Sequence, residues 1–371
     1  MMRSLFRATR IFDGTAFRDG TLVVENGRVA GIAAADAAAT DLGDGLIVPG
    51  MIDLQVNGAG GIAVDGATDA DALASICATM ARLGATGCLP TLITDTPQAT
   101  AHVLDAGAQA ARRGVAGFLG LHLEGPHLDP RRAGAHDPAL IRPMGADDLA
   151  LLVAARAHLP ALKVTVAPEA VTPDQIATLA QAGIIVSLGH SDCDAAMAQR
   201  AMQAGAHCAT HLFNAMSQMA NRAPGLVGAV LDGDGHAGLI VDAIHVDPVT
   251  LRVALAAKAT GLFLVSDCMA LAGTDLAEMR LGGRLIRRDG GRLTLADGTL
   301  AGADLTLPQA VATLTRIGIA PERALAMATS IPASLIGRDD IGHLRAGARA
   351  DFLHLAPDGT LRGVWRGGVA L

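Results

Sequence analysis

Short apolar runs alternate with longer alanine-rich stretches through most of the chain. The apolar runs have the length and composition of buried strands, and the alanine-rich stretches have helical spacing. The expected strands span 46–56, 86–93, 117–124, 161–168, 184–189, 207–213, 238–244 and 262–266. The expected helices between and after them include 69–84, 98–113, 146–158, 173–182, 192–204 and 248–260. This alternation predicts a parallel sheet covered by helices.

Eight such strands in a chain of 371 residues predict a (β/α)8 barrel, whose active site lies at the carboxyl ends of its strands. A doubly wound open sheet is the alternative. It is disfavoured because no glycine-rich phosphate-binding fingerprint follows the early strands. After the eighth strand we expect a β-hairpin insertion at 280–300, followed by helices at 305–317 and 321–336.

Both ends of the chain carry β patterns instead. Residues 21–25 and 28–32 flank Asn26 and Gly27, a pair that favours a tight hairpin turn. Alternating segments at 350–355 and 364–371 lie near the other end. The two ends are therefore expected to pair into one small β domain, with 1–47 and 338–371 in that domain and 48–337 in the barrel.

Composition narrows the class of protein. Apolar residues make up 51% of the chain, and the formal net charge is −7. That charge argues against a nucleic-acid partner, although a locally basic site could still bind an anionic substrate. The five cysteines show no C-x-x-C spacing and suggest reduced thiols in the cytoplasm. No signal-peptide region and no apolar stretch of membrane-spanning length are present, so no membrane association is expected.

Polar residues follow six of the expected strands directly. Charged groups are costly to bury unless they are paired or bind a metal. One strand that ends in polar residues is weak evidence for a site, but six such strand ends, which meet at one rim of a barrel, predict an active site. The polar positions are Asp53, Gln55 and Asn57; His122, Glu124 and His127; His190 and Asp192; His211 and Asn214; Asp242 and His245; and Ser266 and Asp267.

Three of these residues form a possible ligand set for a catalytic metal. Glu124, His190 and His211 come from near-adjacent strands, and one carboxylate with two imidazoles leaves room for water. Zinc fits best, and Fe2+, Co2+ and Mn2+ are alternatives because ligand type does not fix the metal. Asp267, on the eighth strand, would face the water as a general base. The alternatives are a satisfied polar network at the rim for the three ligands and an N-cap for Asp267.

These motifs resemble those of the N-acetylglucosamine-6-phosphate deacetylase family, within the metal-dependent amidohydrolase superfamily. The resemblance covers the whole chain and implies a (β/α)8 barrel, a small β-sandwich formed by both termini and a homodimer. The motifs that carry it occur in the family's order, at 49–58, 121–127, 134–136, 189–191, 211–216, 242–246 and 266–267.

The resemblance also implies residue roles. Glu124, His190 and His211 match the metal ligands, Asp267 matches the catalytic aspartate, and His136 matches a histidine that contacts the substrate near the scissile carbonyl. His122 and His127 are left open between orienting the ligands and a structural role. The implied substrate contacts are Ala135, His136, Asn214, Ala215, Arg222, His245, Leu305, Thr306 and Leu307.

Two departures from the wider superfamily predict a single metal. Many members have His-x-His after the first strand, where this chain has Gln55-Val-Asn57. Many also have a bridging lysine on the fourth strand, whereas this chain has Val-Thr-Val-Ala-Pro at 164–168. Both changes remove ligands for a second ion. Gln55 is expected to hydrogen-bond the substrate or the water that the metal holds.

The resemblance therefore implies hydrolysis of N-acetylglucosamine 6-phosphate to glucosamine 6-phosphate and acetate. Alternative substrates are N-acetylgalactosamine 6-phosphate, a cyclic amide or an N-acyl amino acid. A non-catalytic sensor of amino-sugar phosphates is a further alternative, but a sensor has no need of Asp267 as a base.

Overall fold

The computed structural model describes residues 3–371. Within it the chain divides into two compact units, each described here by itself. One unit contains residues 1–53, 78–87 and 306–371, and the other contains 54–77 and 88–305. The expected domain boundaries after residues 47 and 337 stay a prediction.

Eight parallel strands form the central sheet, in the order β17-β16-β15-β14-β13-β12-β11-β8. A parallel bridge between Val56 and Cys268 joins the first strand to the segment after the last, so the sheet closes. The predicted barrel is confirmed and the open-sheet alternative is wrong. The strands are β8 Met51–Val56, β11 Ala85–Ile93, β12 Leu121–Glu124, β13 Leu162–Val166, β14 Ile185–Leu188, β15 Cys208–Ala209, β16 His236–Leu239 and β17 Leu262–Leu264.

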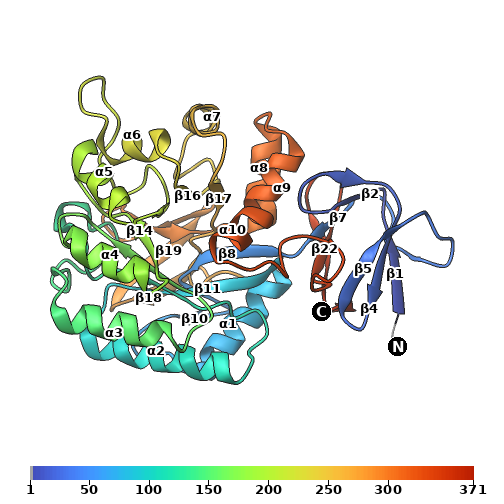
Figure 1. Cartoon of the computed structure of the whole chain (residues 1–371), viewed down its shortest axis with the longest axis horizontal. Helices are drawn as coiled ribbons and strands as arrows, with labels where there is room; N and C mark the ends of the chain where they lie inside the picture. The colour runs from blue at the N-terminus through green and yellow to red at the C-terminus, as the bar shows by residue number, and fades with distance from the viewer. Residues whose placement is uncertain (1–2) are drawn as a thin grey trace. The chain divides into compact units, whose positions relative to one another are not determined.

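Helices follow most of these strands, as the alternation predicts (Figure 1). One helix, α6, was not predicted, because seven of its eight residues are buried and its sequence lacks the polar face that marks an amphipathic helix. The helices are α1 Ala70–Arg82, α2 Pro97–Arg112, α3 Ala146–Arg156, α4 Pro173–Gln181, α5 Ala195–Gln203, α6 Gly225–Asp232, α7 Pro248–Ala257, α8 Leu307–Arg316, α9 Pro321–Ala328 and α10 Ser330–Leu335. None of the helices in the described part is long and apolar enough to cross a bilayer.

The first predicted strand, 46–56, is two strands in different sheets. β7 spans Leu46–Pro49 and pairs with strands of the small domain, whereas β8 belongs to the barrel. Gly50 separates them, and a Cβ atom there would lie 2.0 Å from Thr86 Oγ1. A side chain would collide at this crossing, so the chain needs glycine where it passes from one sheet to the next.

The small domain pairs the two ends of the chain, as predicted. β22 lies antiparallel to β7, which brings the C-terminal strands, red in Figure 1, beside the blue N-terminal ones. Phe6, Leu22, Ile47 and Phe352 pack in one core between the two sheets. One sheet contains β1 Arg3–Arg7, β4 Thr21–Glu25, β5 Arg28–Ala33 and β6 Thr40–Asp41; the other contains β7 with β2 Arg10–Phe12, β3 Phe17–Arg18, β22 Phe352–Leu355, β23 Leu361–Arg366 and β24 Val369–Ala370.

The expected hairpin at 280–300 is a four-stranded antiparallel sheet, which we call the insert. Its strands are β18 Glu278–Leu281, β19 Arg284–Asp289, β20 Arg292–Thr294 and β21 Leu300–Ala303. Its apolar residues form a core of their own with Met269 and Leu271. A two-stranded ribbon, β9 Gly58–Ala59 and β10 Ile62–Ala63, follows the first barrel strand.

Candidate active site

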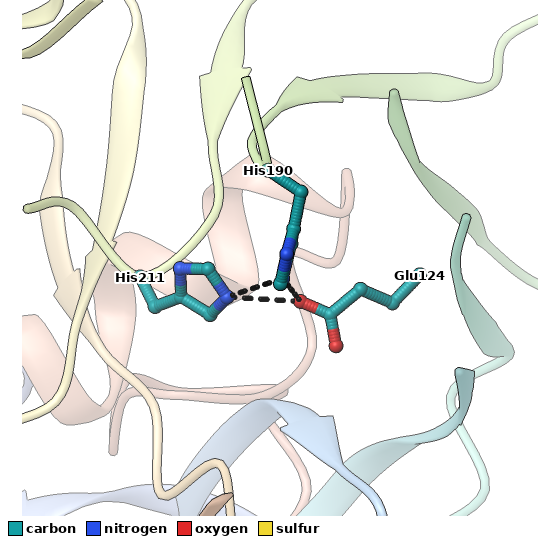
Figure 2. A group of neighbouring side chains, drawn as sticks. All are labelled: Glu124, His190 and His211. Atoms are coloured by element: carbon teal, nitrogen blue, oxygen red, sulfur yellow. Dashed lines mark hydrogen bonds and ion pairs between the residues drawn. The ribbon is translucent and has the colours of Figure 1, made fainter. Parts of the chain in front are cut away.

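Glu124, His190 and His211 converge at the carboxyl ends of their strands (Figure 2). Glu124 ends β12, and the two histidines follow β14 and β15 by two residues each. Glu124 Oε1 lies 3.2 Å from His190 Nε2 and 3.0 Å from His211 Nε2, and the two ring nitrogens are 3.1 Å apart. All three side chains are buried. Three ligand atoms aimed at one point are the arrangement expected around a single divalent ion.

Hydrogen bonding leaves the metal-facing nitrogen of His190 without a proton when the ring is neutral. Its Nδ1–H donates to the backbone carbonyl of Arg132 at 2.8 Å, which leaves the Nε2 lone pair directed at Glu124 and His211. A backbone carbonyl that orients a histidine in this way is typical of metal ligands. Burial alone would raise the pKa of Glu124, but the close contacts with the His190 and His211 rings hold that pKa well below its usual range. The residues therefore fit a divalent metal.

Asp267 faces the same centre from the loop after β17. Its Oδ1 accepts hydrogen bonds from Asn57 Nδ2 at 2.7 Å and from Gln55 Nε2 at 3.0 Å. Burial, and after it the negative charge of Glu124, raises the pKa of Asp267 above its ordinary value. A carboxylate with a raised pKa in a buried site is suited to exchanging protons with a reacting group.

Gln55 lies between the two carboxylates. Its Nε2 is 3.1 and 3.2 Å from the two oxygens of Glu124, as well as 3.0 Å from Asp267. The side chain is completely buried. Gln55 therefore fixes the orientation of Glu124 and Asp267 relative to each other.

His136 is held as a hydrogen-bond donor to the site. The backbone N–H of Thr94 donates to His136 Nδ1 at 3.3 Å, and Thr94 Oγ1 lies 2.7 Å from the same nitrogen. In a neutral ring the proton is then on Nε2, which is 4.0 Å from Glu124 Oε2. Burial, and after it the neighbouring His190, lowers the pKa of His136 to about 3, so the ring is neutral at ordinary pH.

Three of these residues have a backbone conformation that few L-residues adopt. The φ angles are +48° at His190, +30° at His211 and +51° at Asp267. Left-handed backbone at a non-glycine residue is unfavourable by roughly 1–3 kcal/mol and is concentrated at functional sites. No pattern in the sequence indicates these conformations.

A cavity of about 380 Å³ opens above these groups. Of the predicted substrate contacts, Ala135, His136, Asn214, Ala215 and His245 line it. Among residues 3–371, Gln55, Arg222 and Leu305 are outside the lining, and Arg222 is exposed. Thr306 and Leu307 belong to the other compact unit, where Thr306 precedes α8 and Leu307 begins it.

The cavity also has walls that sequence reasoning missed. Arg131 and Arg132 line it, and so do Leu281 and residues 299–302 of the insert. The arginines are held by carboxylates, with Arg131 bound to Asp129 and Arg132 to Asp192. The β insertion at 280–300 was predicted, but its contribution to the cavity was not, because that contribution depends on how a separate sheet packs, which no local pattern encodes.

His122 and His127 have structural contacts. His122 lies inside the barrel, where Nδ1 is 3.2 Å from Thr91 Oγ1 and Nε2 is 2.7 Å from Thr165 Oγ1. Thr165 continues this buried network to Thr210 at 2.6 Å. His127 donates through Nδ1–H to the backbone carbonyl of Arg142 at 3.1 Å. Neither residue belongs to the ligand group.

Comparison with known proteins gives consistent matches. The model of the amidohydrolase family matches residues 46–371. An N-acetylgalactosamine-6-phosphate deacetylase of Shewanella sp. (strain ANA-3) is 37% identical over 89% of this chain and 84% of its own length. An N-acetylglucosamine-6-phosphate deacetylase of Haemophilus influenzae is 33% identical over 88% of each chain. The crystal structure of N-acetylglucosamine-6-phosphate deacetylase from Pasteurella multocida superposes with a TM-score of 0.94, at 31% identity and covering 100% of both chains.

Proposed function

This chain belongs to the amidohydrolase family, and we propose that it removes the acetyl group from an N-acetylated amino-sugar 6-phosphate. N-acetylglucosamine 6-phosphate is the proposed substrate, and N-acetylgalactosamine 6-phosphate is the alternative, since similar relatives carry both names. The observation that carries the proposal is that Glu124, His190 and His211 converge beside Asp267 and His136 in one cavity.

Glu124, His190 and His211 would hold one divalent ion, for which we propose Zn2+, with Fe2+, Co2+ and Mn2+ as alternatives. When bound, such an ion supplies Lewis acidity that polarises the amide carbonyl and lowers the pKa of a water towards about 7. A single ion is proposed because Gln55 and Asn57 occupy the strand end where many superfamily members have a histidine pair, and both amides are engaged with Asp267.

Asp267 is the proposed general base and acid. Its carboxylate takes a proton from the attacking water and then returns a proton to the departing amine. The hydrogen bonds from Asn57 and Gln55 both reach Oδ1, so they hold that oxygen in place. The products are acetate and the free amino sugar 6-phosphate.

His136 is the proposed donor to the carbonyl oxygen. Because Thr94 occupies its Nδ1, the Nε2–H is the group that remains to stabilise the negative charge developing on that oxygen. A neutral imidazole serves this purpose, and the low pKa of His136 keeps it neutral.

The sugar phosphate is proposed to contact Asn214, Ala215 and His245, which line the cavity. His245 Nδ1 lies 2.6 Å from Asp242 Oδ2, which orients the ring. Ala135, Gln55, Arg222, Leu305, Thr306 and Leu307 stay predicted substrate contacts. A cytoplasmic homodimer also stays a proposal; none of the five cysteines forms a disulfide, which suits a reducing compartment.

Acetate release tests the proposal. Metal-stripped protein should be reconstituted with one metal at a time and supplied with both acetylated sugar phosphates. Metal-dependent release of acetate from at least one sugar is expected, and the ratio between the sugars identifies the substrate. Tight binding of either sugar without acetate release would favour the sensor alternative and overturn the proposal.

Arg222 requires a separate test, because it is exposed. If it anchors the phosphate, Arg222→Ala should weaken turnover of N-acetylglucosamine 6-phosphate far more than that of unphosphorylated N-acetylglucosamine, since arginine binds phosphate through paired hydrogen bonds. Arg112→Ala, an arginine in the last turn of α2, is the control. Equal effects on both sugars would remove Arg222 from the site.

A further inference from the structure

We infer that an apolar wall of the cavity holds the methyl group of the substrate's acyl chain and selects acetyl over longer acyl groups. This wall, the acyl wall, consists of Ile93, Ala135, Met269, Leu281 and Ala301, all of which line the cavity. The inference rests on the proposed function, because it concerns the same amide.

Two members of the acyl wall lie beside the groups that hold His136. Ile93 is paired in register with Glu124 and precedes Thr94, whose backbone and hydroxyl contact His136 Nδ1. Ala135 precedes His136 in the chain. These neighbours place apolar surface next to the oxygen side of the scissile carbonyl.

Met269 extends the acyl wall towards Asp267, the proposed base, because it follows Asp267 by two residues in the chain. Gly302 of β21 passes so close that a Cβ atom there would lie 2.6 Å from Met269 Cγ and 2.8 Å from the carbonyl oxygen of Asp267. The next residue, Ala303, donates its N–H to that carbonyl at 2.8 Å. The insert is therefore fixed directly against the segment that carries the proposed base.

The remaining members, Leu281 and Ala301, come from the insert itself and are buried in its apolar core with Met269. Arg284 on β19 donates to the backbone carbonyl of Ala135, which ties the insert to the loop of His136. Because the insert is hydrogen-bonded to the segments that carry His136 and Asp267, the acyl wall cannot easily move to make room for a larger acyl group.

The order of strands decides which end of the substrate faces this wall. Asn214 and His245 follow β15 and β16, whereas Ile93 ends β11. In the closed barrel β17, which precedes Asp267, stands between β16 and β8, and β11 comes after β8. Around the barrel, Asn214 and His245 thus lie on one side of Asp267 and Ile93 lies on the other. A sugar phosphate on the polar side directs the acyl chain towards the apolar side.

The test compares acyl groups of increasing length. The values of kcat/KM for N-acetyl-, N-propionyl- and N-butyrylglucosamine 6-phosphate are measured with metal-reconstituted protein. One methylene in a closed apolar pocket changes selectivity by about 10- to 200-fold, so the natural chain should prefer acetyl by at least about tenfold. Leu281→Ala should narrow that preference by about tenfold. Ala301→Val enlarges a side chain of the acyl wall and should increase the preference for acetyl.

Leu293→Ala is the matched control. Leu293 is fully buried in the same apolar core but lies outside the cavity lining, so its truncation should lower stability without changing the propionyl-to-acetyl ratio. An unchanged ratio in both Leu281→Ala and Ala301→Val, or an equal change in Leu293→Ala, would overturn the inference. If the natural chain releases no carboxylate from these amides or from their galactosamine counterparts, the proposed function fails; if it releases acetate and only the ratio fails to move, the acyl wall alone is wrong.

Discussion

Gln55 donates a hydrogen bond from Nε2 to Oδ1 of Asp267 at 3.0 Å, and the same nitrogen faces both oxygens of Glu124. One uncharged donor therefore lies between the carboxylate proposed as a metal ligand and the carboxylate proposed as the base. Two ionised carboxylates sharing a closed site repel each other, and each raises the pKa of the other. The amide offsets part of that repulsion.

Replacing this amide by a carboxylate should change the pH dependence of catalysis. Gln55→Glu removes the donor and adds a negative charge, which raises the pKa of Asp267 further. Because the base must be ionised, activity falls as the pH drops through that pKa, so the acid limb of kcat/KM should move to higher pH. Gln109→Glu, at an exposed position on α2, is the control and should leave the limb in place. A shift of the limb to lower pH would contradict the assignment.

Asp267→Asn should separate catalysis from metal binding. Asparagine can present its amide oxygen to Asn57 and Gln55, so the local hydrogen bonds survive while the proton acceptor is lost. We expect kcat to fall by about 10²–10⁴-fold, with metal content unchanged by elemental analysis. Near-normal turnover would show that another group acts as the base.

His190→Asn should lower the amount of bound metal. One of three converging ligand atoms is removed, and the bond that Nδ1 makes to the carbonyl of Arg132 is lost with it. The measurement is metal content after dialysis against a weak chelator. His102→Asn, at an exposed position on α2, should retain full occupancy. Equal metal content in both variants would exclude His190 as a ligand.

His136→Asn should lower the plateau of the pH profile without moving its acid limb. With a pKa of about 3, His136 is already neutral where the limb of Asp267 falls, so its titration contributes nothing there. Loss of a donor to the developing oxyanion lowers kcat by about 10²–10³-fold. A displaced limb would mean that His136 takes part in proton transfer.

His122→Phe should affect stability more than chemistry. The substitution leaves the hydroxyls of Thr91 and Thr165 each short of one buried partner. The expected loss is about 1–3 kcal/mol in the free energy of unfolding, measured by urea denaturation. Metal content should stay close to that of the natural chain, and an unchanged denaturation midpoint would argue against a structural role.

The polar residues at the strand ends could be predicted because each lies close in sequence to the apolar run that forms its strand. An apolar run followed at once by Glu124, or closely by His190 or Asp267, places a polar group at the rim of a barrel, whatever the rest of the chain does. The barrel itself follows from counting such runs. The break at Gly50 was not predicted because the residues on both sides of it, 46–49 and 51–52, are apolar and no polar residue marks the change of sheet.

The walls of the cavity could not be predicted, since they depend on contacts between distant segments. Leu281 looks like an ordinary strand residue until the insert is packed against Met269. The tautomer of His136 likewise depends on Thr94, which lies 42 positions away. Spacing along the chain carries no information about either relationship.

The left-handed backbone at His190, His211 and Asp267 affects how any mutational scan of this enzyme should be interpreted. Asparagine, aspartate and glycine tolerate this conformation, whereas β-branched residues do so poorly. Valine or threonine at these positions would disturb the main chain in addition to removing the functional group. A scan that ranks positions by the loss of activity averaged over all substitutions would therefore overstate the chemical importance of these three residues. Fitness measured for asparagine and glycine alone would separate the chemistry of the side chain from the shape of the loop.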